Sequence, residues 1–506
     1  MNQGNLFAHF EKLALDASEA TLIETPDGAR HTYQDMLDIT GRFAASLAAC
    51  GVQPGDRVAA QVEKSVDAFF LYLAVLRIGG IYLPLNTAYK TAELAYFLED
   101  ASPKVFLFDP EGAAEKQALA EQHGVGHALT LSAVQTGSFL DQARTVTASA
   151  ATVTRGGDDV AAIIYTSGTT GRPKGAMLTH ANLLSNGQTL TRLWGFTKDD
   201  VLLHALPLFH AHGLFISSHC VLLSQSRMLF LPRFKAEEVL ALLPRTTVMA
   251  GVPTFYTRLL DLPGFNHEAT ANMRLFISGS APLLPETAHA FEARTGQRIL
   301  ERYGMTESVI IASNPFIGER RIGSVGQPID GVEVRISGEN VTSVPAGSVG
   351  EIQIRGSGVM KGYWRNPEKT QEDMTADGWF RTGDLGTLSD DGYLDIVGRA
   401  KDLVITGGYN VYPKEVEMVI DALPGVYESA VIGLPDSDFG EAVTAVVVPS
   451  SDTLAAEAVI GHVKASLANY KVPKHVFFVD TLPRNTMGKV MKNELRARFE
   501  KQAGQA

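Results

Sequence analysis

The chain has 506 residues, of which 45% are hydrophobic and 20% are charged, and its formal net charge is −12. A chain of this length exceeds one ordinary hydrophobic core, so we expect two or more domains. The acidic balance, without a Lys/Arg cluster, argues against a nucleic-acid partner and requires that any anionic ligand be held by local groups.

The cysteines and the apolar segments indicate a cytoplasmic protein with no integral membrane segment. Cys50 and Cys220 form neither a disulfide framework nor a metal-spaced set. Residues 1–17 lack a basic stretch followed by an apolar run, so we expect no secretory signal. The most apolar long segment, 68–85, is interrupted by Arg77 and two glycines, and it predicts a core helix leading into a strand.

From about residue 55 to 315, short β-rich runs alternate with helical stretches. This alternation predicts an α/β architecture with largely parallel sheets covered by helices. The predicted strands include DRVAAQV (56–62), KVFLFD (104–109), RMLFLP (227–232), VMAGV (248–252) and RLFISG (274–279), and the predicted helices include 65–80 and 236–245.

A loop rich in Gly, Ser and Thr, IIYTSGTTGRPKG, occupies residues 163–175. Such a loop gathers backbone N–H groups and hydroxyls around an anionic phosphate, and Lys174 adds a mobile positive charge. The pattern G-x-x-x-x-G-K-[ST] is absent, because Lys174 is followed by Gly175. We expect the loop to join a buried strand at 161–165 to a helix that begins near Asn182. A flexible surface turn is the alternative.

The predicted secondary structure changes in character twice in the second half of the sequence. Short strands and turns predict a β-rich subdomain at about 320–399, and a helix, several strands and a basic final helix follow in 400–506. We therefore predict a large N-terminal α/β domain, 1–399, of parallel-rich sheets covered by helices, and a small α+β C-terminal domain, 400–506.

Five short motifs follow one another along the chain: YTSGTTGRPKGAM (165–177), ERYGMTE (301–307), FRTGD (380–384), GRAKDLVITGG (398–408) and PRNTMGKV (483–490). They occur in the order and spacing of the AMP-forming acyl-CoA synthetases, the adenylate-forming superfamily, which the chain resembles along nearly its whole length. Within that family it is most similar to the malonyl-CoA synthetases. The resemblance implies that a carboxylic acid, ATP and coenzyme A react through acyl-AMP, releasing pyrophosphate and AMP.

The resemblance assigns the phosphates of ATP to two of these motifs. Nucleophile and electrophile are both anionic, so the chemistry needs preorganised positive potential more than a general base. Glu307 is implied as the ligand of a phosphate-bridging Mg²⁺, with Thr306 on the α-phosphate. A helix N-terminal acid is the alternative for Glu307. The implied β- and γ-phosphate ligands are Thr166, Ser167, Gly168, Thr169, Thr170 and Lys174.

The resemblance also implies the nucleoside contacts. Tyr303 is similar to the aromatic residue that stacks on adenine, and Gly279 and Ser280 lie in the segment that lines the base. Asp384 would accept hydrogen bonds from both ribose hydroxyls, assisted by Arg399, because an ionised carboxylate is an acceptor only. A plain turn is the alternative for the TGDLG segment.

Lys489 is implied as the cation that neutralises the α-phosphate and the attacking carboxylate, and a solvated surface lysine is the alternative. The family rotates its C-terminal domain after adenylation, and Lys401 occupies the hinge position. Gly407 and Gly408 would line the pantetheine tunnel, where a side chain would block the thiol; a turn is the alternative. Acetylation of Lys489 would erase its charge.

The acid substrate is implied to be malonate or methylmalonate. His210 resembles the residue that guards the carboxylate entrance, and a packing histidine is the alternative. Malonyl-CoA synthetases carry an arginine on the helix after SGSAPLL, whereas this sequence has His289 there. An unpaired carboxylate in a dry site costs several kcal/mol, so His289 or Arg258 would have to hold the second carboxylate.

Other functions remain open from the sequence. Val309, followed by two isoleucines, favours a short or medium monocarboxylic acid instead. A stand-alone adenylation enzyme would deliver the acyl group to a carrier-protein thiol, and a luciferase-like oxygenase would oxidise the adenylate. A non-catalytic nucleotide-binding protein would lack Lys489 or Glu307, and both are present.

Overall fold

The computed structural model divides the chain into two compact units. The first unit comprises Met1–Glu333 and Arg355–Phe380, and the second comprises Val334–Ile354 and Arg381–Ala506. The structure describes residues 4–147, 149–166, 173–338, 343–406, 409–436, 439–451, 453–486 and 488–503.

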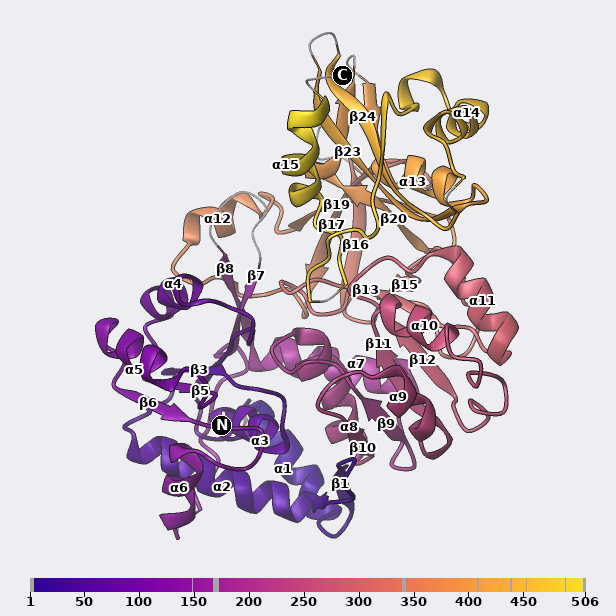
Figure 1. The fold of residues 1–506 in the computed structure, drawn as a ribbon. Coiled ribbons are helices and arrows are strands. Elements are labelled where there is room, and N and C mark those ends of the chain that lie inside the picture. Colours follow the sequence, from indigo (N-terminus) through magenta and orange to yellow (C-terminus); the bar gives the residue numbers. More distant parts are fainter. Residues whose placement is uncertain are drawn as a thin grey trace. The chain divides into compact units, whose positions relative to one another are not determined.

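A seven-stranded sheet in the first unit contains β7 and β8, the two strands on either side of residues 167–172 (Figure 1). The sheet order is β18-β8-β7-β4-β3-β5-β6. The strands from β7 to β6 run parallel, and β8 and β18 are added antiparallel at one edge. The bounds are β3 Arg57–Gln61, β4 Ile81–Pro84, β5 Val105–Phe108, β6 His127–Thr130, β7 Val160–Thr166, β8 Lys174–Thr179 and β18 Gly362–Tyr363.

A nine-stranded sheet forms the other half of the first unit, in the order β15-β14-β13-β12-β11-β9-β10-β1-β2. Its strands from β13 to β1 are parallel, which confirms the predicted α/β class. The bounds are β1 Thr21–Glu24, β2 Arg30–Thr32, β9 Val201–His204, β10 Arg227–Phe230, β11 Val248–Gly251, β12 Leu275–Ser278, β13 Leu300–Tyr303, β14 Ala312–Ser313 and β15 Gln327–Pro328.

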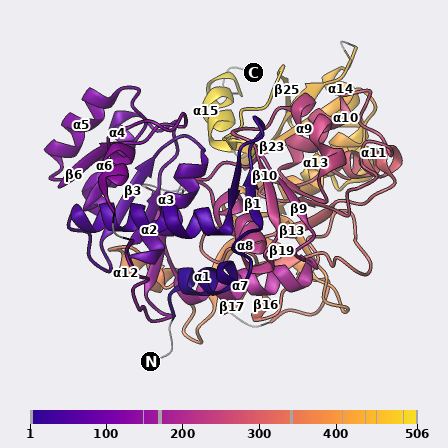
Figure 2. The ribbon, with the colours of Figure 1, turned by 90° about the horizontal axis from the view of Figure 1, so that it is seen from below.

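Helices cover both sheets, and α7 and α8 lie between them, with α1 packed against both helices (Figures 1 and 2). Helix α3 is buried along nearly its whole length, so its apolar sequence marks a core helix, as predicted. None of the helices in the described ranges is long and apolar enough to cross a membrane. The bounds are α1 Leu6–Asp16, α2 Tyr33–Ala49, α3 Val66–Arg77, α4 Thr91–Ala101, α5 Ala113–Gln122, α6 Ser138–Thr145, α7 His180–Leu193, α8 Ser218–Ser224, α9 Ala236–Leu242, α10 Pro253–Leu260, α11 Pro285–Thr295, α12 Pro367–Glu372, the π-helix η1 His212–Ser217 and the 3₁₀ helix η2 Leu243–Arg245.

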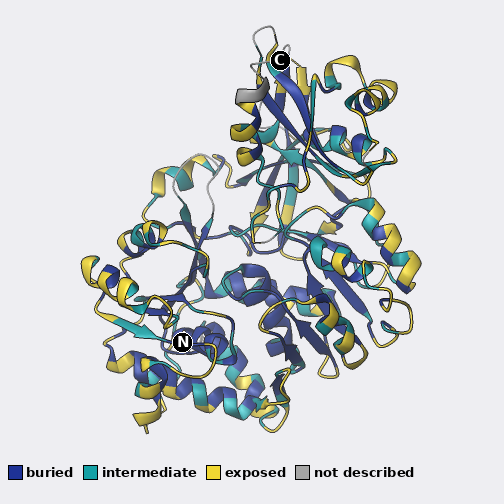
Figure 3. Cartoon of the chain, viewed as in Figure 1, coloured by how far each residue is buried: buried dark blue, intermediate teal, exposed yellow. Residues whose placement is uncertain are grey.

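The second unit contains two sheets. A four-stranded sheet has the order β16-β17-β19-β20, and a five-stranded sheet has the order β22-β21-β24-β23, with β25 beside β24. Apolar side chains of α13 and α14 pack with one set of strand residues and those of α15 with the alternate set, so both faces of the larger sheet are buried (Figure 3). The bounds are β16 Val332–Ser337, β17 Gly350–Gly356, β19 Phe380–Leu388, β20 Leu394–Arg399, η3 Ala400–Asp402, β21 Val404–Thr406, β22 Tyr409–Val411, α13 Pro413–Asp421, β23 Val426–Asp436, β24 Gly440–Pro449, α14 Ala456–Ser466, η4 Asn469–Lys471, β25 His475–Phe478 and α15 Lys492–Ala503.

The Gly-rich loop joins two strands, so the prediction that it leads into a helix is wrong. Strands β7 and β8 form an antiparallel hairpin, and α7 begins only at His180. The segment KGAMLT buries Ala176 and Leu178 in alternation, which is the pattern of a strand. Thr179 then caps the helix by accepting a hydrogen bond from the backbone N–H of Asn182.

The predicted β-rich subdomain at about 320–399 is divided between the two units. Its four-stranded sheet falls largely in the second unit, whereas β18 and α12 belong to the first. The reason is that β18 completes the edge of the seven-stranded sheet, opposite β8. The domain boundary expected near residue 399 stays a prediction.

Candidate active site

The ends of the Gly-rich loop are fixed by the hairpin of β7 and β8. Thr166 pairs with Lys174 across the two strands, and the hydroxyl of Tyr96 donates to the carbonyl of Pro173 at 2.6 Å. The ammonium group of Lys174 lies 5.1 Å from the ring centroid of Tyr363, which is a cation–π distance. The remaining predicted phosphate ligands, Ser167, Gly168, Thr169 and Thr170, lie outside the described residues.

The segment after β12 makes a close approach to strand β13. A Cβ atom on Gly279 would lie 2.4 Å from Cζ of Arg302, so any other residue there would displace the guanidinium group of Arg302. Ser280 follows with φ of +70°, in the left-handed region that non-glycine residues rarely adopt. Its Oγ lies 3.2 Å from Nδ1 of His212. Ser280, which the sequence places beside the adenine base, thus contacts the first residue of the π-helix η1.

The loop after β13 carries the second group of predicted ATP residues. Tyr303 and Thr306 are half-buried, and Glu307 is buried. The hydroxyl of Tyr363 donates to Oε1 of Glu307 at 3.2 Å. Val309 has φ of +61°, an outlier for a β-branched residue, so the backbone of this loop is strained.

Two histidines next to η1 are neutral at pH 7. His210 is half-buried, and its Nδ1 accepts a hydrogen bond from the backbone N–H of His212 at 3.3 Å. Burial and the positive charge of Arg302 lower the pKa of His210 to about 4. The same two causes lower the pKa of His212 well below its ordinary value. Each imidazole can therefore donate one hydrogen bond and accept another without carrying a charge.

Arg302 is a site residue to which the sequence reasoning gave no role. The residue is 4% exposed, and its Nε and Nη2 atoms have no hydrogen-bond partner. Burial lowers its pKa to about 9, so it is a cation at pH 7. Within the described ranges no carboxylate forms an ion pair with it. A charged residue inside the buried strand of the ERYGMTE motif was the signal available in the sequence.

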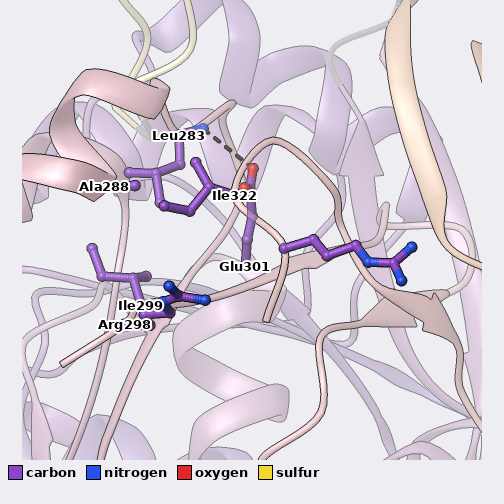
Figure 4. A pocket seen from close by; sticks show the side chains of 7 residues that line it. Leu283, Ala288, Arg298, Ile299, Glu301 and Ile322 are labelled. Atoms are coloured by element: carbon purple, nitrogen blue, oxygen red, sulfur yellow. Dashed lines mark hydrogen bonds between the residues drawn. The ribbon is translucent and has the colours of Figure 1, made fainter. Parts of the chain in front are cut away.

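The opposite side of β13 borders a small pocket (Figure 4). Glu301 points there, because successive side chains of a strand face opposite ways, and it accepts a hydrogen bond from the backbone N–H of Leu283 at 3.3 Å. This bond ties β13 to the segment after β12. The pocket is lined by Leu283, Ala288, Arg298, Ile299, Glu301, Arg321 and Ile322.

The two cations proposed from the sequence for a second carboxylate lie at the surface. His289 is exposed on α11, and Arg258 is exposed on α10. The reason is the helix periodicity, which buries Ala288 and Leu259 instead. Arg302 is the buried cation near the two histidines.

In the second unit, Asp384 and Arg399 form an ion pair across β19 and β20. Asp384 is buried, and its Oδ1 lies 2.7 Å from Nε of Arg399. Lys401 follows in η3, where burial lowers the pKa of its ammonium group. Its neighbour Asp402 lies 2.8 Å from Arg496, which ties η3 to α15.

Lys489 lies on a hydrogen-bonded loop of the second unit. Its backbone N–H donates to Oδ1 of Asn485 at 3.0 Å, and its carbonyl accepts from the backbone N–H of Asn485 at 2.9 Å. The residue is exposed on its loop, but burial of its ammonium end and the charge of Arg399 lower its pKa to about 8, against the opposing charge of Asp384. Gly407 and Gly408 lie outside the described residues.

Two family models match the chain. The model described as AMP-binding enzyme matches residues 10–364, and the one described as AMP-binding enzyme C-terminal domain matches residues 415–489. The first covers more than half of the chain and includes the hairpin of β7 and β8, the histidines and Arg302. The second ends at Lys489.

Similar proteins include several acyl-CoA ligases. The crystal structure of ATP-bound MatB from Rhodopseudomonas palustris is 51% identical, with a TM-score of 0.97 over 99% of this chain and 100% of that one. A malonate–CoA ligase from Arabidopsis thaliana is 35% identical over 89% of this chain and 79% of its own length. A feruloyl-CoA synthase from Amycolatopsis is 37% identical over 93% and 94%, respectively.

Proposed function

The chain belongs to the AMP-binding enzyme family and is an ATP-binding acyl-CoA ligase, and we propose that its acid substrate is malonate or methylmalonate. In the first half-reaction a carboxylate oxygen attacks the α-phosphorus of ATP, and pyrophosphate leaves. In the second, the sulfur of coenzyme A attacks the acyl carbon, and AMP leaves. The similarity to MatB and to a malonate–CoA ligase supports this substrate class.

The observation that carries this proposal is the buried cation of Arg302 without a partner. A buried charge left unpaired costs several kcal/mol, and a carboxylate that accepts from Nε and Nη2 would offset that cost. Malonate offers a second carboxylate after the first has reacted, whereas a monocarboxylic acid does not. The neutral His210 and His212 would add hydrogen bonds without repelling the guanidinium.

We assign the phosphates to the loop between Thr166 and Lys174 and to the residues after β13. Thr306 would contact the α-phosphate, and Glu307 would bind Mg²⁺. The chemistry of the site fits this metal, because Mg²⁺ usually takes one or two carboxylates together with substrate phosphates. Within the described part of the chain, no cluster of three or more His, Cys, Asp or Glu side chains could hold a metal ion by itself. The bound metal would neutralise phosphate charge.

We assign ribose recognition to Asp384, held by Arg399, and charge neutralisation at the α-phosphate to Lys489. Lys401 would be the hinge between a body of 1–399 and a mobile domain of 400–506, and Gly407 and Gly408 would line the path of the thiol. The matches to separate models for 10–364 and 415–489 support a boundary in the segment between them. After adenylation, Lys489 would withdraw so that coenzyme A can enter.

A short or medium monocarboxylic acid is the second candidate. Val309, Ile310 and Ile311, which begin two residues after Glu307, are buried, and an apolar lining favours an alkyl chain. Such an acid would leave Arg302 unpaired.

Pyrophosphate release separates these candidates. The purified protein would be supplied with ATP, Mg²⁺, coenzyme A and one of malonate, methylmalonate, propionate, butyrate or hexanoate. We expect the highest kcat/KM with malonate or methylmalonate, together with formation of the CoA thioester. Preference for hexanoate would refute the dicarboxylate proposal, and thioester formation only on a carrier protein would refute the coenzyme A ligase.

A further inference from the structure

Tyr363 connects two parts of the candidate ATP site that lie far apart in the sequence. Strand β18 pairs with β8, so Tyr363 stands opposite Ala176, two residues beyond Lys174. On its other side, the backbone N–H of Met360 donates to the carbonyl of Glu307 at 2.7 Å. β18 therefore ties the strand that begins with Lys174 to the loop that carries Glu307.

The side chain of Tyr363 contacts both of these residues as well. Its hydroxyl donates to Oε1 of Glu307 at 3.2 Å, with the carboxylate of Asp373 as a second nearby acceptor, and the ammonium group of Lys174 lies 5.1 Å from its ring centroid. Tyr363 is 4% exposed and Glu307 is 7% exposed, so the hydrogen bond lies within the protein. One side chain thus orients a buried carboxylate through its edge and attracts a cation through its face.

We propose that Tyr363 is a positioning residue for adenylation. Its hydroxyl fixes the direction in which Glu307 presents its carboxylate to a divalent cation, and its ring holds the ammonium group of Lys174 until phosphates bind. A phenol suits this role because it donates a hydrogen bond without adding charge, whereas Lys or Arg would neutralise the carboxylate. The proposal rests on the function proposed above for Glu307 and Lys174.

The substitution Tyr363→Phe removes the hydroxyl and keeps the ring. We expect the Mg²⁺ concentration for half-maximal pyrophosphate release to rise roughly 10-fold or more, as for other residues that orient metal ligands, with the KM for coenzyme A unchanged. Calorimetry without acid or coenzyme A gives a second readout. Affinity for ATP with Mg²⁺ should fall by a similar factor, and affinity for ATP in EDTA should stay the same.

The substitution Tyr363→Leu also removes the ring, so affinity for ATP in EDTA should fall too. Tyr33→Phe is the matched control, because Tyr33 is another buried tyrosine of the first unit, and its hydroxyl donates to the carbonyl of Ser226 at 2.7 Å. Its Mg²⁺ dependence should equal that of the wild type.

An unchanged Mg²⁺ dependence in Tyr363→Phe, or an equal shift in Tyr33→Phe, would overturn the proposal. Calorimetry does not require the acid, so it tests Tyr363 independently of the substrate. A protein that binds ATP with Mg²⁺ as expected but does not activate malonate would refute the proposed function alone.

Discussion

Oδ1 of Asp384 lies 2.7 Å from Nε of Arg399, its register partner on the neighbouring strand. The ion pair holds the carboxylate on a sheet, in a buried position, before any ligand arrives. A preorganised acceptor of this kind loses little side-chain entropy when it binds hydroxyl donors.

Asp384→Asn should therefore weaken ATP binding. The amide has one acceptor oxygen in place of two, and it leaves Arg399 without its counterion. Because hydrogen bonds to charged groups contribute about 1.5–3 kcal/mol, we expect the KM for ATP to rise roughly tenfold or more. Asp395→Asn changes an exposed carboxylate on the neighbouring strand β20 and should leave this KM unchanged. An unaltered KM in Asp384→Asn would remove Asp384 from the site.

Lys489→Ala should separate the two half-reactions. Removing one cation from a developing charge costs roughly 100- to 1000-fold in rate, so acyl-AMP formation should fall by that factor. Thioester formation from supplied acyl-AMP should remain, and single-turnover assays measure each step. Lys464→Ala on the exposed face of α14 is the control. An equal loss of both steps would contradict the proposal that Lys489 acts in adenylation and then withdraws.

The adenylation rate should also depend on pH through Lys489. Its pKa is lowered to about 8, and only the protonated form carries the required charge. The kcat/KM for adenylation should therefore fall tenfold per pH unit above about pH 8. Lys489→Arg keeps its charge throughout this range, so its residual activity should lack the alkaline decline. The same decline in Lys489→Arg would assign it to another group.

Arg302→Met should abolish the preference for a dicarboxylic acid. We expect kcat/KM for malonate to fall about 100-fold or more, because the second carboxylate would be buried without a partner, while activity with propionate or butyrate persists. The unfolding temperature should stay the same or rise, since the substitution removes an unpaired buried charge.

Arg258→Met and His289→Ala are the comparison variants for Arg302, because both residues are exposed. We expect both to retain activity with malonate. A loss confined to either of them would assign the second carboxylate to the surface residue instead of Arg302.

Much of the fold and the family was predictable from the sequence. The alternation of strands and helices, the core helix α3 and the α+β C-terminal region are confirmed. The resemblance carried by five motifs is confirmed by the family models and the relatives. These features are local in sequence, since each rests on periodicity or on a short run of residues.

Features that depend on distant parts of the chain were not predictable. The hairpin of β7 and β8 was mistaken for a strand-to-helix loop, because KGAMLT is short and the helix signal follows directly. Arg302 was overlooked because the lack of a partner is a property of packing. The bond from Tyr363 to Glu307 joins two motifs whose spacing does not indicate contact.

The pairing of β18 with β8 also has a consequence for protein synthesis. The strand that begins with Lys174 leaves the ribosome long before its neighbour Tyr363 does, so its outer edge is unpaired in the nascent chain. The seven-stranded sheet is complete only after that later segment has emerged and paired with β8. A ribosome-bound chain that stops short of residue 362 therefore lacks the strand that covers this edge of the sheet.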